Sequence, residues 1–329
     1  MWSVVSEATF YALPPTFKML KVYTATIGII VLFAVNIFLA FQNSNFELPL
    51  AKFIDQTSNQ ERQAYILPIS GPNYIPFLDS NVPQPVISAK SAVVFDTHSS
   101  RFLYEKDGKA KRPIASLTKI MSAVVVLENL DLEDIVTISS SSIKVDGEKQ
   151  DLYLGEKMSV RNLLKLALIE SSNDAVYALA SHAGNKGIDF VQTMNVKARV
   201  LGMLDSNFID PAGLNDNAYS TVQDLIKLIE YSLNYQEIWD ISAEKTAIVE
   251  SSDEKIKHTA QSTNRLIGLI KDLIGGKTGY TEGAGQCMIL VTNAPNYPSK
   301  IISIVLGSQD RFSDTQKLID WTRRAYKWE

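Results

Sequence analysis

The pattern of apolar and polar residues changes sharply along this chain, and its first strong feature is an apolar run. Residues 22–41, "VYTATIGIIVLFAVNIFLAF", contain no charged side chain. A helix of about 20 apolar residues matches the thickness of the hydrocarbon core of a bilayer. Because every face of this helix would be apolar, we expect a membrane anchor rather than a buried core helix.

The residues around this run indicate its orientation. Lys18 and Lys21 precede it, whereas the segment that follows, "QNSNFE", has no basic residue. The positive-inside rule then places residues 1–21 in the cytoplasm and the rest of the chain outside the cytoplasmic membrane. A cleaved signal peptide is the alternative. We favour an uncleaved single-pass anchor, because the run is long for a signal and no A-x-A-like site follows it.

Residues 42–86 show no sustained hydrophobic period. They contain several prolines, which indicates a linker: Pro49, Pro68, Pro72, Pro76, Pro83 and Pro85. From there the pattern becomes globular, and we expect one catalytic domain over residues 87–329.

Short apolar runs and amphipathic stretches alternate within this domain. Residues 91–97 and 101–106, joined by "HSS", predict a β-hairpin. Helical periodicity follows at 116–130, 160–170, 173–183, 188–202 and 221–233, then strand patterns at 275–281, 286–293 and 300–308, and a last helix at 313–328. Strands at both ends with helices between them predict one sheet, flanked by helices and carrying a helical insertion.

The composition mainly excludes certain kinds of partner, crosslink and cofactor. The 329 residues are 46% hydrophobic and 21% charged, with a net charge of −4 and no long basic run, so we expect no nucleic-acid partner. The single cysteine, Cys287, excludes an internal disulfide framework. His98, His182 and His258 lack metal-ligand spacing, so we expect neither a metal nor another cofactor.

Ser116 and Lys119 stand at the start of the apolar helix 116–130. At i and i+3 they share one helix face. A lysine that is desolvated beside a helix N-terminus has a lowered pKa, so its neutral amine can take the proton of the serine hydroxyl. The pair therefore predicts a serine nucleophile with a lysine base.

No motif is decisive alone. The pattern S-x-x-K recurs along the chain, for example at Ser116/Lys119, Ser141/Lys144 and Ser252/Lys255. The pattern S-x-N also occurs three times, at Ser171/Asn173, Ser232/Asn234 and Ser262/Asn264, whereas K-T-G occurs once, at Lys277-Thr278-Gly279. Ser116 alone opens a long apolar helix. The order Ser116-x-x-Lys119, Ser171-x-Asn173, Lys277-Thr278-Gly279 resembles that of the penicillin-recognising serine acyltransferases.

The surrounding residues narrow this resemblance. The segments "RPIASLTKIM", "LIESSNDAVYALA", "DPAGLNDNAYST" and "GGKTGYTEGAGQCMIL" are similar to the low-molecular-mass D-alanyl-D-alanine carboxypeptidases, the S11 peptidase family. The resemblance covers about residues 86–328. It implies an α+β fold of the β-lactamase/transpeptidase type, with a mainly antiparallel five-stranded sheet flanked by helices and an all-helical subdomain.

The resemblance also implies roles for single residues. Ser116 would be the nucleophile, Lys119 the general base, and Ser171 a proton relay toward the leaving amine. Asn173 would bind the substrate backbone and hold Lys119. The remaining expected substrate-binding residues are Lys277 and Thr278 for the terminal carboxylate, Gly279 for close approach of the peptide, the backbone N–H of Tyr280 in the oxyanion hole with that of Ser116, and Arg311 as a carboxylate-steering cation.

Two positions depart from the family pattern. Tyr280 stands where a histidine often follows K-T-G, and Ser172 replaces the glycine common in S-x-N. If only the N–H of Tyr280 is used, the first change leaves the oxyanion hole intact but alters substrate preference.

The expected function is removal of the terminal D-alanine from peptidoglycan stem peptides ending in D-Ala-D-Ala, through an acyl-enzyme that penicillins also form. A D,D-endopeptidase, a class A-like β-lactamase and a non-catalytic β-lactam sensor are the alternatives. The β-lactamase would require a glutamate in an E-x-x-L-N type segment, and the chain offers only Asp210 in "DPAGLND".

Overall fold

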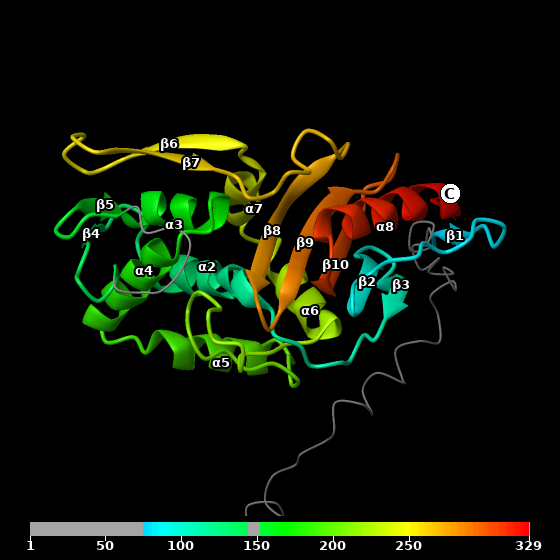
Figure 1. Ribbon diagram of the computed structural model, residues 1–329, viewed down its shortest axis with the longest axis horizontal. Helices are drawn as coiled ribbons and strands as arrows, with labels where there is room; N and C mark the ends of the chain where they lie inside the picture. Colours follow the sequence, from blue (N-terminus) through cyan, green and yellow to red (C-terminus); the bar gives the residue numbers. More distant parts are fainter. Residues whose placement is uncertain (1–74, 144–151, 329) are drawn as a thin grey trace, which may run out of the picture. The chain divides into compact units, whose positions relative to one another are not determined.

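The computed structural model describes residues 75–143 and 152–328 (Figure 1). The expected anchor at 22–41 and most of the expected linker lie outside these ranges. Within the ranges, no helix combines the length and apolarity that crossing a bilayer requires.

One five-stranded sheet forms the frame of the domain. Its strands run in the order β3-β2-β10-β9-β8, and every neighbouring pair is antiparallel. The bounds are β2 (Ser91–Asp96), β3 (Arg101–Lys106), β8 (Leu273–Thr281), β9 (Gly285–Asn293) and β10 (Lys300–Ser308). The strands come from both ends of the domain, as the sequence predicts, and the expected sheet architecture is confirmed.

Helices cover both faces of the sheet (Figure 1). The C-terminal helix α8 (Arg311–Ala325) packs on one face through buried residues that include Leu318 and Trp321. On the other face α6 (Val222–Ser232) contacts β2 and β10. Because both faces are covered, β2 is buried along its whole length.

The predicted helical subdomain lies beside the edge strand β8 (Figure 1). Its central helix is α2 (Thr118–Asn129), whose first nine residues are all buried. Around it pack α3 (Val160–Ile169), α4 (Asn173–Asn185) and α5 (Phe190–Val200). The serine Ser159 caps α3 by accepting the N–H of Asn162, and Ser172 caps α4 by accepting that of Ala175.

The sequence pattern missed the short elements. These are the hairpin β4 (Ile135–Thr137) with β5 (Lys157–Ser159), the hairpin β6 (Thr246–Glu250) with β7 (Lys257–Gln261), and α7 (Gln236–Ala243). Each strand has five residues or fewer, and the polar outer face of β7, "KHTAQ", masks its alternation. Such segments carry too few residues to show a period.

The two ends of the domain meet. The strand β1 (Phe77–Leu78) pairs with β11 (Tyr326–Lys327), and Trp321 Nε1 donates to the carbonyl of Val82. The domain therefore makes its first contacts before the expected linker boundary at residue 86. The last predicted helix also ends earlier than expected, at Ala325 and not at residue 328, because residues 326–327 form this strand pair.

A buried carboxylate reinforces the same end. Asp314 in α8 accepts hydrogen bonds from the Ala89 N–H (2.8 Å) and the hydroxyls of Ser88 (2.7 Å) and Ser308 (2.6 Å). Burial raises the pKa of Asp314, but the hydrogen bonds from Ser308 and Ser88 outweigh it and hold the pKa below the usual value. The segment before β2 is thereby tied to α8 and to the end of β10.

Candidate active site

Ser116 lies in a 3₁₀ turn, η2 (Ala115–Leu117), which leads directly into α2. The preceding Ala115 has a left-handed backbone with φ of 48°. Such a conformation is costly for alanine and persists only where surrounding structure enforces it. Lys119 follows in the first turn of α2, so the turn and the helix together set the two side chains toward each other.

Lys119 is buried, with 1% of its surface exposed. Its Nζ is 2.8 Å from Ser116 Oγ, 2.8 Å from Asn173 Oδ1 and 3.1 Å from the carbonyl oxygen of Ala212. Burial lowers the pKa of Lys119 to about 7, against an opposing effect of the Asp210 carboxylate. The amine is therefore neutral in a large fraction of molecules near neutral pH.

The three partners of Lys119 differ in what they can donate. A neutral amine has two hydrogens and one lone pair, so in one of its three contacts the nitrogen must accept the hydrogen bond. The carbonyl of Ala212 and Oδ1 of Asn173 only accept, whereas the Ser116 hydroxyl can donate. In the neutral state, the Ser116 proton thus points at the lone pair of Lys119.

A second serine–lysine pair faces the first. Ser171 sits between α3 and α4 with a left-handed backbone, φ of 70°. Lys277 Nζ donates to Ser171 Oγ at 2.8 Å and to the carbonyl of Thr278 at 3.0 Å. Burial, followed by the nearby charges of Lys119 and Arg311, holds the pKa of Lys277 well below its usual value.

The strand β8 forms one wall of the site. A Cβ atom at Gly279 would lie 3.0 Å from both the Ser116 nitrogen and the Ile114 carbonyl oxygen, closer than most real contacts. Glycine at this position therefore allows β8 to approach η2. The Thr278 hydroxyl is 2.6 Å from that of Thr263, and Arg311 donates from a guanidinium nitrogen to the Gly279 carbonyl at 2.7 Å.

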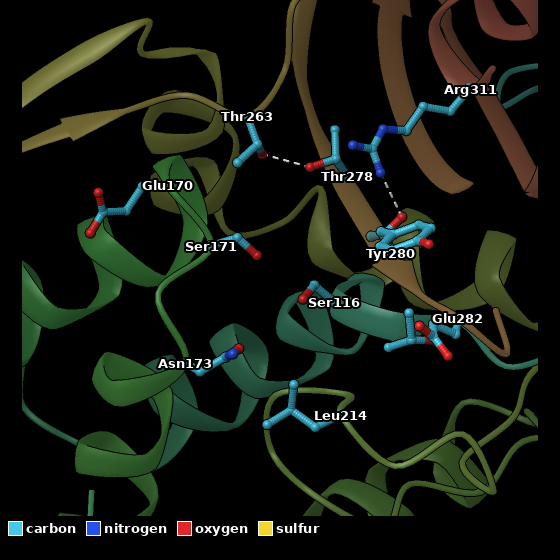
Figure 2. A pocket seen from close by; sticks show the side chains of 12 residues that line it. Ser116, Glu170, Ser171, Asn173, Leu214, Thr263, Thr278, Tyr280, Glu282 and Arg311 are labelled. Atoms are coloured by element: carbon cyan, nitrogen blue, oxygen red, sulfur yellow. Dashed lines mark hydrogen bonds between the residues drawn. The ribbon is translucent and has the colours of Figure 1, made fainter. Parts of the chain in front are cut away.

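These residues surround one cavity of about 350 Å³. Ser116, Ser171 and Asn173 line its centre, and Thr278, Thr263 and Arg311 lie together toward one end (Figure 2). Leu214 and Glu282 lie toward the other end, and Tyr280 stands between Arg311 and Glu282. The structure thus brings every site residue predicted from the sequence to one place, including Arg311. Lys119 and Lys277 lie buried beneath the cavity wall.

A tight turn supports Lys119 from below. The Asp210 carboxylate accepts four backbone N–H groups, from Ala212 (2.8 Å), Gly213 (2.6 Å), Leu214 (3.1 Å) and Asn215 (2.9 Å). The turn presents the Ala212 carbonyl to Lys119 and the Leu214 side chain to the cavity. Gly213 has φ of 78°, and a side chain there would overlap the backbone of Ala115.

Several cavity residues did not emerge from the sequence. Glu170, Leu214, Thr263 and Glu282 line the cavity, but none of them was named as a site residue from the sequence. Thr263 lies inside one of the three S-x-N matches, Ser262-Thr263-Asn264, which precedes β8; its position before K-T-G was the available signal. Glu170, Leu214 and Glu282 lie in the segments that resemble the family, "LIESSNDAVYALA", "DPAGLNDNAYST" and "GGKTGYTEGAGQCMIL", but no local pattern shows that they reach the cavity.

Comparisons with known proteins agree with this geometry. The model of the peptidase S11 family, described as D-alanyl-D-alanine carboxypeptidase, matches residues 79–310. A D-alanyl-D-alanine endopeptidase of Escherichia coli (strain K12) is 31% identical over 242 residues, which cover 72% of this chain and 78% of the relative.

Solved structures give the same result. The Streptomyces K15 DD-transpeptidase has a TM-score of 0.67 and 29% identity, covering 73% of this chain and 98% of that chain. Penicillin-binding protein D2 from Listeria monocytogenes, in its cefotaxime-bound form, has a TM-score of 0.62 and 30% identity, with coverage of 73% and 98%. The chain belongs to the peptidase S11 family of D-alanyl-D-alanine carboxypeptidases.

Proposed function

We propose that the protein is a serine peptidase that removes the terminal D-alanine from peptidoglycan stem peptides through an acyl-enzyme on Ser116. The observation that carries the proposal is the contact between Ser116 Oγ and the buried Lys119 Nζ, at 2.8 Å. A serine hydroxyl is a weak nucleophile until an adjacent base removes its proton, and this pair supplies such a base.

Acylation begins at this pair. Ser116 Oγ attacks the carbonyl carbon between the two D-alanines while its proton passes to Lys119 Nζ. The backbone N–H groups of Ser116 and Tyr280 donate hydrogen bonds to the oxyanion that forms. Such preorganised donors stabilise a developing negative charge effectively in a desolvated site. Asn173 Oδ1 keeps Lys119 in place during the transfer.

The leaving group requires a proton. Ser171 Oγ lies between the cavity and Lys277 Nζ, at 2.8 Å from the latter, so a proton can pass through it to the departing amine of the terminal D-alanine. The C–N bond then breaks, and the rest of the peptide stays on Ser116 as an ester. Lys119 then loses to solvent the proton it took from Ser116, and Lys277 takes one up. A water molecule attacks the ester and gives a proton to the neutral Lys119, which returns it to Ser116 Oγ as that oxygen leaves and the shortened peptide is released.

One end of the cavity carries groups that can bind the terminal carboxylate of the substrate. Two hydroxyls, those of Thr278 and Thr263, and the Arg311 guanidinium lie together there (Figure 2). Lys277 adds charge from beneath the same wall when it is protonated. A carboxylate at this end places the preceding carbonyl beside Ser116, and Gly279 lets the peptide lie against β8.

Penicillins are expected to acylate the same serine. They present a strained amide and a carboxylate in the same relation as the substrate. The relative penicillin-binding protein D2 has been crystallised with cefotaxime, which supports the proposal. Release should be slow, because the Asp210 carboxylate is occupied by four backbone N–H groups and is not disposed to activate water.

The deciding experiment measures D-alanine released from a pentapeptide ending in D-Ala-D-Ala, with fluorescent-penicillin labelling in parallel. Ser116→Ala should abolish both. Ser252→Ala is the matched control, since Ser252 belongs to another S-x-x-K match at an exposed site and should leave both unchanged. Labelling that survives in Ser116→Ala would remove Ser116 as the nucleophile.

A D,D-endopeptidase acting on crosslinked peptides is the second candidate. It is favoured by the relative from E. coli, which carries that name. Cleavage of a purified crosslinked peptide dimer, scored beside D-alanine release, separates the two activities. Labelling without any peptide cleavage would indicate a sensor, and rapid hydrolysis of a chromogenic cephalosporin a β-lactamase.

We also propose that residues 22–41 anchor the protein in the cytoplasmic membrane, with the N-terminus inside and the catalytic domain outside. The support is the uncharged apolar run and the two lysines before it. Peptidoglycan lies on that side of the membrane. Protease treatment of intact spheroplasts should degrade the catalytic domain, and protection of the domain would contradict this topology.

A further inference from the structure

The cavity continues past Ser116 along β8, away from the carboxylate-binding end. Its lining on this wall runs without a break from Thr278 through Tyr280 to Glu282. If the terminal carboxylate binds at Thr278 and Arg311, as proposed above, the acyl part of the peptide must extend toward Tyr280 and Glu282. The residue that precedes the two D-alanines then has its side chain at this end of the cavity.

Glu282 is the charged group that this side chain meets. In the portion of the chain that the structure describes, Glu282 forms no hydrogen bond or ion pair, and it is exposed to the cavity (Figure 2). The turn that carries it is fixed by Asp216, whose carboxylate accepts the Thr281 hydroxyl and the Gly283 N–H. The turn is thus braced by one carboxylate, while a second one remains available to a ligand.

The two ends of the cavity therefore differ in charge. Arg311 lies beside Thr278, and Glu282 lies at the opposite end of the cavity (Figure 2). The Asp216 carboxylate contacts Thr281 and Gly283, the residues on either side of Glu282. A bound peptide is favoured when its own charges run in the opposite sense, with a carboxylate toward Arg311 and a cation toward Glu282. A peptide in which the residue before D-Ala-D-Ala has a free side-chain amine offers such a cation.

We propose that Glu282 forms a subsite for the primary ammonium on the side chain of the residue before D-Ala-D-Ala. This inference rests on the proposed function, since that function sets the direction of the peptide. It assigns to Glu282 the discrimination between stem peptides with a free side-chain amine at this residue and those in which that amine is acylated. Acylation of that amine removes the cation and the preference.

The test compares two synthetic peptides, Nα-acetyl-Lys-D-Ala-D-Ala with a free side-chain amine and its Nα,Nε-diacetyl counterpart, by kcat/KM for D-alanine release. The wild-type full-length protein should prefer the free amine by about threefold to fivefold at low salt, the size expected of one partly exposed ion pair. The preference should decline as salt is added. In Glu282→Gln the ratio should fall to about one, and in Glu282→Lys it should reverse.

The control is Glu254→Gln in the turn between β6 and β7, an exposed glutamate outside the cavity lining, which should keep the wild-type ratio. Equal kcat/KM for the two peptides in the wild type, or a preference that persists in Glu282→Gln, would overturn the subsite. Failure to release D-alanine from either peptide would instead contradict the proposed function. A thermal melt of each variant verifies that it is folded.

Discussion

Two lysine side chains are buried around the nucleophile, and among the described residues neither forms an ion pair with a carboxylate. Lys119 instead contacts Ser116, Asn173 and the Ala212 carbonyl, and Lys277 contacts Ser171. Neutral polar partners satisfy the hydrogen bonds of an amine without stabilising its protonated form as strongly as a carboxylate would. The site thereby keeps both amines easy to deprotonate, as a base or a proton relay requires.

This arrangement predicts the pH dependence of acylation. The base must be neutral, so the second-order rate of penicillin acylation should rise with pH and level off above the Lys119 pKa of about 7. Lys119→Arg should lower that rate by about a thousandfold or more, since a guanidinium does not deprotonate in proteins. Stopped-flow labelling across pH measures both.

The control for that substitution is Lys245→Arg, at an exposed position far along the chain from the motifs. It should acylate as the wild type does. Normal acylation by Lys119→Arg would show that the base is another group.

Asp210 is predicted to tune the same titration. Its charge opposes the lowering of the Lys119 pKa, and its carboxylate holds the turn that presents the Ala212 carbonyl. In Asp210→Asn the rising limb of the pH profile should move to lower pH, and the plateau rate should fall by about tenfold as the turn loosens. A purely structural role would lower the plateau and leave the limb where it is.

At the scale of elements, the packing of the 210–215 turn against η2 shapes the site. Gly213 has φ of 78° and lies against the Ala115 carbonyl and the Thr118 hydroxyl, so any side chain there collides with η2. Ala115 itself is held at φ of 48°. The turn and η2 therefore have one compatible arrangement, which is the one that sets Ser116 opposite Lys119.

A pair of glycine substitutions isolates this contact. Gly187→Ala, at φ of 81° with open space around it, should cost about 1 kcal/mol of unfolding free energy for the backbone conformation alone. Gly213→Ala should cost about 3 kcal/mol, because overpacking adds to the same backbone cost. Urea denaturation gives both values. Equal losses of unfolding free energy in the two variants would show that the 210–215 turn can move to accommodate the added methyl group.

Long amphipathic elements were predictable, and short ones were not. The helices α2 through α6 and the strands β8 to β10 each carry enough apolar positions to show their period. Ser116, Lys119, Ser171, Asn173 and Lys277-Thr278-Gly279 were predictable because each motif is local. Glu282 and Asp210 also lie in segments that resemble the family, but their roles were not predictable, since those roles come from what lies beside them after folding.

At the scale of the whole molecule, the boundary of the domain is open to test. A protein starting at residue 87, the expected boundary, would lack β1 and the Trp321–Val82 contact. It should be less stable than one starting at residue 75 by about 1–3 kcal/mol, the value of a few hydrogen bonds and their packing. Differential scanning fluorimetry compares them, and equal melting temperatures would place the boundary at residue 87 after all.

The pairing of β1 with β11 places the two ends of the described domain side by side. Phe77 is in register with Lys327, so a short peptide could join the two ends without crossing the cavity wall. New termini could then open in the turn between β6 and β7, outside the cavity lining. The order of the three motifs along the chain would change, whereas their order in space, on which the chemistry depends, would not.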